Sequence, residues 1–204
     1  MTKKLLMVFI RNPELGKVKT RLAKQTSDET ALAIYNELLL HTNNITKGLG
    51  FDKWVFYTNK ITHNDIWNTG AFEKKIQSEG DLGNKMYQAF RQGFEAGYKQ
   101  IVIIGSDIEQ LTQEIIETAF IQLENQTVIG PAEDGGYYLL GLNSLRKDVF
   151  ESKIWGTNTV LRDTLTDLKN EQVHQLTLLN DIDVLDDIKP DSDLYKYIKQ
   201  YVSV

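Results

Sequence analysis

Short apolar runs alternate along the chain with longer segments whose apolar residues recur at helical spacing. Residues 5–10 are continuously apolar, which is typical of a strand covered on both faces, and residues 101–104 have the same character. Residues 28–47 instead place their apolar side chains on one stripe, as an amphipathic helix does. Strands that alternate with helices predict an α/β fold with a mostly parallel sheet, helices on both faces, and 5–10 and 101–104 as interior strands.

The remaining elements follow the same alternation. Ser27 or Asp28, Asp81 and Thr112 each stand at the start of a helical pattern, where short polar side chains cap free backbone N–H groups. We expect further strands at 54–58, 75–77, 127–129, 137–140 and 173–178. We expect further helices from 81, at 112–123, from 157 or 158 to 168, and at 191–202.

Length and composition add limits to this picture. A chain of 204 residues fits one domain spanning residues 1–204, and the absence of cysteine excludes disulfides and thiolate zinc sites. A net charge of −5 gives no reason to expect a nucleic-acid partner. The apolar run 5–10 is too short for a signal peptide, and nothing approaches a membrane span, so we expect a cytoplasmic protein without a membrane partner.

Candidate chemistry begins in the loop after the first strand. This loop carries Arg11, Pro13, Gly16, Lys19 and Arg21. Glycine lets a backbone approach a phosphate closely, and Lys19 and Arg21 could then hold a diphosphate. A solvated basic turn is the competing interpretation. The loop matches neither the Walker pattern nor the dinucleotide-binding glycine pattern.

Two carboxylates follow the strand at 101–104. Asp107 directly after a buried strand suits a hard cation such as Mg²⁺ or Mn²⁺, which prefers oxygen ligands. Glu109 could join the same ion only if the loop bends. Alternatively, Asp107 caps a turn. Ser106 lacks the surroundings of a nucleophile elbow.

Two further glycine-containing turns carry polar groups. Glu133 and Asp134 precede a glycine pair and then a strand, which suits either projection of the acids toward a ligand or a tight turn. Gly80, Asp81 and Gly83 lead a strand into a helix N-terminus, whose N–H groups suit a base carbonyl or a phosphate. The alternative there is an N-cap followed by a packing glycine.

The motifs NPELGKVKTRLA (12–23), GDLGNKM (80–86), IIGSD (103–107) and GPAEDGGYYLLG (130–141) together resemble a known family. It is the bacterial GT-A-like nucleotide-diphospho-sugar transferase family, once catalogued as a domain of unknown function, with members assigned to arsenosugar biosynthesis. The chain is more distantly similar to 2-phospho-lactate and molybdenum-cofactor guanylyltransferases. The resemblance implies a GT-A-like three-layer αβα sandwich, a nucleotide in the N-terminal half and a metal on Asp107. Glu109 departs from the proline that is usual in the family, and Arg11 from its common lysine.

These residues lead to a hypothesis of glycosyl transfer from a nucleotide-diphospho-sugar to a small-molecule acceptor. Lys19 and Arg21 would hold the diphosphate, and Asp107, alone or with Glu109, would bind the metal. Asp134 or Glu133 would act as general base or complete the metal shell. The alternative is a nucleotidyltransferase that joins an NTP to a phosphorylated or acidic small molecule and releases pyrophosphate. The missing LAGGxSxRxGxxK pattern of molybdenum-cofactor guanylyltransferase favours sugar transfer. A nucleotide sensor without turnover is a third possibility.

Other conspicuous residues have simpler expected roles. The C-terminal acids Asp181, Asp183, Asp186 and Asp187 lack the spacing of a calcium loop, so we expect them to cap a short helix. Trp155 suits either stacking on a sugar ring or packing in the core.

Overall fold

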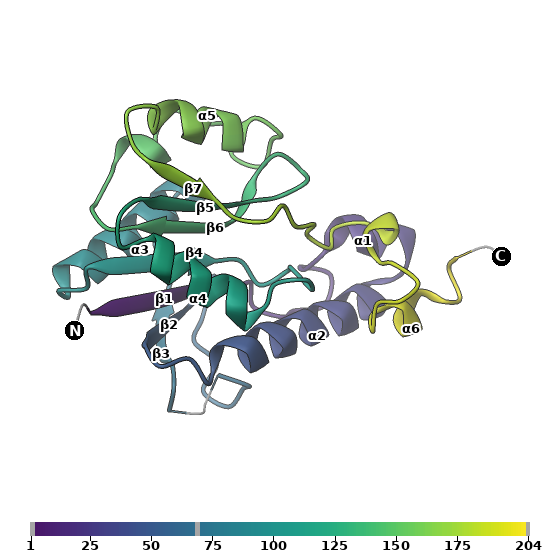
Figure 1. The fold of residues 1–204 in the computed structure, drawn as a ribbon. Helices are drawn as coiled ribbons and strands as arrows, with labels where there is room; N and C mark the ends of the chain where they lie inside the picture. The colour runs from purple at the N-terminus through teal and green to yellow at the C-terminus, as the bar shows by residue number, and fades with distance from the viewer. Residues whose placement is uncertain (1–2, 68–69, 203–204) are drawn as a thin grey trace.

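The computed structural model describes residues 3–67 and 70–202, which form a seven-stranded mixed sheet with helices (Figure 1). The strands lie in the order β3-β2-β1-β4-β6-β5-β7, and among them only β6 runs against the others. The predicted mostly parallel sheet and the interior places of β1 and β4 are confirmed. The strands are β1 (Lys4–Phe9), β2 (Asp52–Tyr57), β3 (Glu73–Ile76), β4 (Gln100–Ile104), β5 (Thr127–Pro131), β6 (Tyr137–Leu142) and β7 (Val173–Gln175).

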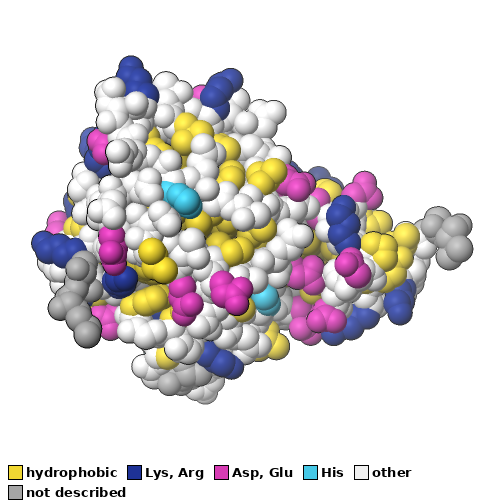
Figure 2. Space-filling model, viewed as in Figure 1, with side chains coloured by type: hydrophobic (Ala, Val, Ile, Leu, Met, Phe, Trp, Pro, Cys, Tyr) yellow, Lys and Arg dark blue, Asp and Glu magenta, His cyan; other side chains and the backbone are white. Residues whose placement is uncertain are grey.

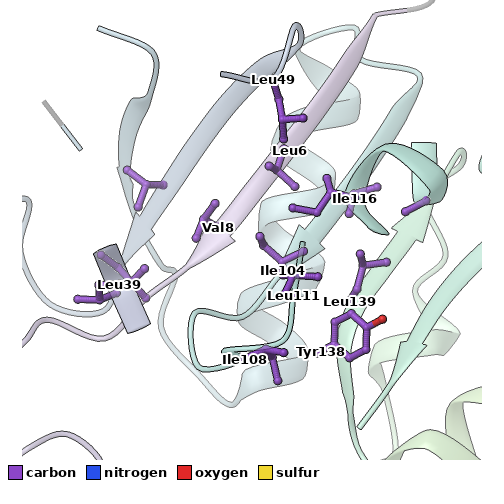
Figure 3. Close-up of a cluster of buried hydrophobic side chains, with 14 of the residues drawn as sticks. Leu6, Val8, Leu39, Leu49, Ile104, Ile108, Leu111, Ile116, Tyr138 and Leu139 are labelled. Atoms are coloured by element: carbon purple, nitrogen blue, oxygen red, sulfur yellow. The ribbon is translucent and has the colours of Figure 1, made fainter. Parts of the chain in front are cut away.

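Helices cover both faces of the sheet, because successive side chains of a strand point to opposite sides. Leu6 and Val8 of β1 pack with α2 (Asp28–Thr46) and α4 (Gln113–Gln122) (Figure 3). Leu5 and Met7 of the same strand pack with α3 (Leu82–Glu95), and α5 (Val160–Asp167) covers the same face. The expected three-layer arrangement is therefore confirmed.

Three of the helices begin at the predicted capping residues. Ser27, Asp81 and Thr112 each accept a hydrogen bond from the backbone N–H three residues later, at the starts of α2, α3 and α4. Each cap satisfies one of the donors that a helix leaves free at its N-terminus.

A separate apolar cluster lies beside the end of the sheet. Leu22 of α1 (Thr20–Gln25) and Leu38 of α2 pack there against Ile182 and Ile198 of the C-terminal segment. This segment includes the short helices η2 (Leu185–Asp187) and α6 (Tyr195–Ile198), and Figure 1 shows it passing from β7 to α1. Residues far apart in sequence are thereby brought to one end of the molecule.

Several predicted boundaries of helices and strands are wrong in the second half of the chain. The helix predicted over 191–202 is α-helical only at 195–198, with i→i+3 turns on either side, because the segment follows the surface of α1 and α2. The strand predicted at 173–178 ends at 175, and the helix predicted from 157 or 158 to 168 begins at 160. The sequence pattern also does not predict α1.

Within residues 3–67 and 70–202, no helix has the length and apolar character needed to span a membrane.

Candidate active site

A cavity of about 750 Å³ opens beyond the carboxyl ends of β1 and β4, where ligands bind in open α/β sheets. It is lined by the loops that follow these strands, by the first turn of α3, by the segment before β6 and by the segment at 181–183. The side of the molecule that carries α1 and the C-terminal segment shows basic and acidic side chains next to one another (Figure 2). The cavity is of the size that holds a small-molecule ligand.

Lys19 is the buried cation of this cavity. It stands before α1 with left-handed backbone angles (φ 44°) and its side chain is only 6% exposed. Its Nζ donates to Asp107 Oδ2 and to Asp183 Oδ1, both at 2.9 Å. Burial lowers the pKa of the Lys19 ammonium, but the two carboxylates raise it more, so its pKa lies above the ordinary value. Lys19 is therefore a permanent positive charge between two acids.

Three carboxylates gather around this cation. One oxygen from each of Asp107, Asp181 and Asp183 lies within 4.8 Å of the others. Burial, followed by the negative charges of Asp134 and the other two acids, raises the pKa of Asp181 to about 6. A group of oxygen ligands at this spacing has the chemistry that Mg²⁺ and Mn²⁺ select.

The backbone explains why Asp181 and Asp183 reach Asp107. Between them Ile182 is buried in the apolar cluster, and its N–H donates to the carbonyl oxygen of Asp107 at 3.0 Å. Ile182 packs in this cluster, whereas Asp181 and Asp183 on either side of it line the cavity. The prediction that these two acids cap a helix is wrong, whereas Asp187 does accept from the N–H groups of Asp183 and Val184.

The cationic loop after β1 is held against the loop after β4. The hydroxyl of Tyr35 accepts from the Arg11 N–H at 2.8 Å and lies 3.2 Å from Ser106 Oγ. Arg11 lines the cavity, and Arg21 Nη1 donates to Asp183 Oδ2 at 3.3 Å while its side chain stays 69% exposed. Two further cations therefore border the acidic group and remain open to a ligand.

Of the other predicted acids, the structure places only some in the cavity. Asp134 lines the same cavity as Asp107, as expected, and accepts from the Gly136 N–H at 2.8 Å. Glu133 is exposed and does not line it. Glu109 points to the C-terminal segment, where both carboxylate oxygens accept from Ser192 Oγ at 2.6 and 2.8 Å. The structure does not bring Glu109 to the three grouped aspartates.

Of the residues predicted in the glycine-containing turns, likewise only some line the cavity. Gly80 and Asp81 line the cavity, and Asp81 caps α3. Gly83 is a packing glycine, because a Cβ there would lie 2.4 Å from Trp155 Nε1. Pro13 and Gly16 are not among the lining residues, although Gly16 shapes the loop with a φ of +72°.

The raised pKa of Asp181 predicts a pH-dependent penalty on stability. Between pH 3.8 and about 6 the folded protein keeps a proton that the unfolded chain has released, so stability falls as the pH rises. We expect Asp181→Asn, in EDTA, to raise the melting temperature at pH 7 by roughly 2–4 °C and to change it little at pH 4. Thermal melts of both proteins at the two pH values check this, and an equal shift at both would contradict it.

Solved structures define the class of fold. A nucleotide-diphospho-sugar transferase, provisionally assigned, from Desulfovibrio desulfuricans G20 is 27% identical, with a TM-score of 0.84, covering 98% of this chain and 95% of that chain. A cytidylyltransferase from Leptospira borgpetersenii shares the fold at 13% identity (TM-score 0.62; 98% and 95% covered). So does a 4-diphosphocytidyl-2C-methyl-D-erythritol synthase from Anaerococcus prevotii at 10% identity (TM-score 0.56; 98% and 96% covered).

The family follows from a direct match. Residues 42–157, more than half of the chain, match the family described as "Uncharacterized protein conserved in bacteria (DUF2064)". The chain belongs to this family, and the resemblance drawn from its motifs is confirmed. Comparison with curated proteins gives no match.

Proposed function

We propose that this protein is a glycosyltransferase that uses a nucleotide-diphospho-sugar donor together with Mg²⁺ or Mn²⁺. The broader class, a transferase of glycosyl or nucleotidyl groups, is supported by the relatives that share its fold. The observation that carries the proposal is the group of Asp107, Asp181 and Asp183 next to the buried Lys19 in one cavity. It combines oxygen ligands for a cation with a fixed positive charge for a phosphate.

The donor set fits a divalent metal, because all three carboxylates offer an oxygen within 4.8 Å of the others. When bound, the ion would neutralise part of the charge of a diphosphate leaving group. Lys19 and Arg21 would bind the phosphate oxygens, with Arg11 at the entrance. We leave Glu109 out of the proposed metal site because its carboxylate is engaged by Ser192.

The remaining cavity residues have roles around these charges. Asp134 would take the proton of the acceptor hydroxyl, since it lines the cavity without direct contact to Lys19. Gly80 and Asp81, at the start of α3, would lie along the nucleoside. Pro13 and Gly16 would act only through the shape of the loop that carries Lys19.

Nucleotidyl transfer is the second candidate, because cytidylyltransferases share this fold. The same metal and the same cations would serve it, with an NTP as donor and pyrophosphate as leaving group. Binding separates the two functions only in part, whereas the released product separates them fully.

A thermal-shift panel of NTPs, NDPs and NDP-sugars, each with and without Mn²⁺, tests the proposal. A ligand that binds only the folded protein raises its melting temperature by mass action. We expect the largest Mn²⁺-dependent shifts with NDPs and NDP-sugars. Shifts confined to NTPs, with pyrophosphate released in the presence of an acceptor, would favour nucleotidyl transfer, and no Mn²⁺-dependent shift at all would contradict both.

Arg21→Ala is expected to weaken nucleotide-diphosphate binding by about 1–3 kcal/mol, because the exposed guanidinium would make a charge-assisted contact with phosphate. Calorimetric titration in the presence of Mn²⁺ measures the change. Lys17→Ala is the matched control, since this lysine lies on the same loop but pairs with Glu14 outside the cavity. Equal affinities for Arg21→Ala and wild type would remove Arg21 from the site.

A further inference from the structure

Part of the cavity lining is apolar and has no role in the proposed phosphate and metal chemistry. Trp155 and Tyr137 belong to this part together with Leu82, Met86 and Val160. Trp155 is half-buried, whereas Trp54 and Trp67 are 5% and 1% exposed and belong to the core. Leu82 is 46% exposed, an unusual position for a leucine in the first turn of a helix that borders a cavity.

The indole ring of Trp155 is fixed from two sides. It meets the ring of Tyr137 edge to face, with 6.5 Å between centroids and 85° between planes. Its Nε1–Cε2 edge lies against Gly83, where an added Cβ would approach to 2.4 and 2.6 Å. Gly83 therefore makes room for the ring against α3. Any larger residue at this helix position would displace the aromatic side chain from the cavity wall.

Two charged side chains line the same cavity as these apolar residues. They are Asp134, three residues before Tyr137, and Lys85, in the first turn of α3. A ring with one apolar C–H face and hydroxyl groups at its edge matches such a wall, because aromatic side chains bury apolar area while neighbouring polar groups hold the hydroxyls. A sugar ring has this chemistry, and a nucleotide phosphate does not.

We infer that Trp155, with Leu82 and Met86, forms a subsite for the apolar face of a sugar ring next to Asp134. The inference deepens the proposed glycosyl transfer and rests on it for the origin of the sugar. Two sources share this chemistry: the sugar of the donor and a sugar ring of the acceptor. The subsite fixes the class of ring, and the binding experiment distinguishes the sources.

Iodide quenching of tryptophan fluorescence reads out this subsite, because Trp54 and Trp67 are buried and Trp155 is the partly exposed indole of the described chain. The probes are UDP and UDP-glucose, GDP and GDP-mannose, and phenyl β-glucoside added to each diphosphate, all with Mn²⁺. We expect an NDP-sugar to protect the fluorescence more than its NDP. We also expect Trp155→Ala to weaken NDP-sugar binding by about 10-fold while NDP binding stays within about twofold.

Two variants separate ring contact from folding. Trp155→Phe keeps an aromatic face and is expected to retain most of the NDP-sugar affinity. Ile154→Ala changes the neighbouring side chain, which is 75% exposed and does not line the cavity, and should have no effect. Circular-dichroism melts confirm that each variant is folded.

Each result decides a separate point. Protection by phenyl β-glucoside, with NDP-sugar affinity unchanged in Trp155→Ala, would assign the ring to the acceptor and still support the subsite. Unchanged fluorescence and unchanged affinity with every sugar, while NDP binds, would overturn the subsite and leave the proposed function standing. If no nucleotide binds, the proposed function fails, and the phenyl β-glucoside titration alone then supports or overturns the sugar subsite.

Discussion

Replacing Asp107 by asparagine is expected to abolish Mn²⁺-dependent nucleotide binding while the protein stays folded. The asparagine keeps the size of the side chain but removes the charge that the metal and Lys19 both require. We expect Mn²⁺ affinity, measured calorimetrically with an NDP present, to fall by at least about 100-fold, more than the loss of a residue that only supports a ligand. Binding of NDP in EDTA should change far less.

Glu109→Gln is the matched control for this experiment. It removes one carboxylate from the same loop, but that carboxylate contacts Ser192 and is absent from the group around Lys19. We expect its Mn²⁺ affinity to stay within about twofold of wild type, which is much smaller than a tenfold change in the binding constant. If Asp107→Asn binds Mn²⁺ and NDP as wild type does, Asp107 serves only as a partner of Lys19, and the proposed metal site loses its centre.

The parts of the fold that the sequence predicts well are those in which local pattern and tertiary position agree. The strands β1 and β4 are buried on both faces, so their uninterrupted apolar runs could arise in few other ways. The caps Ser27, Asp81 and Thr112 act within one turn of backbone, and all three are found. Such features depend on neighbours in the sequence, which is why sequence reasoning reaches them.

Helix α1 and the C-terminal segment show the opposite case. Lys19 precedes α1 with left-handed angles and no side-chain cap, so the sequence carries no start signal. Residues 191–202 have helical spacing, yet contacts with α1 and α2 reshape them into turns around a four-residue helix. Tertiary packing determines the conformation of both segments, and the local sequence propensity does not predict it.

The candidate site divides in the same way. Lys19, Arg21 and Asp107 follow strands whose carboxyl ends share one edge of the sheet, so their position near one another could be anticipated. Asp181 and Asp183 arrive through the docking of Ile182, which only the folded chain makes visible. The alternation acid–apolar–acid at 181–183 was the available signal, because it places both carboxylates on one side of an extended segment.

The position of Lys19 also determines how the site would handle two opposite charges. Its Nζ contacts Asp107 and Asp183, both of which belong to the proposed metal ligands. The same ammonium therefore attracts a phosphate and competes with a cation for carboxylate oxygens. Removing it should change the two affinities in opposite directions, which a purely structural ion pair would not do.

Lys19→Met tests this opposition, because methionine fills nearly the same buried volume without the charge. We expect NDP binding in the presence of Mn²⁺ to weaken by about 10- to 100-fold, as the loss of a charge-assisted contact of roughly 1.5–3 kcal/mol implies. Binding of Mn²⁺ alone should become tighter, because no cation then lies between the carboxylates. Isothermal titration of Mn²⁺, and of NDP at saturating Mn²⁺, measures both changes.

Stability provides a further check on Lys19→Met. In EDTA the variant should unfold with a free energy lower by about 1–2 kcal/mol, less than for a fully buried pair, because the side chains of Asp107 and Asp183 are each 37% exposed. Added Mn²⁺ should restore this loss by binding the carboxylates that Lys19 has left. Lys17→Met, on the exposed part of the same loop, should leave the Mn²⁺ affinity, the NDP affinity and the free energy of unfolding unchanged. If Lys19→Met loses stability, is not rescued by Mn²⁺ and still binds NDP like wild type, Lys19 is a structural partner of the two acids and the diphosphate must bind elsewhere.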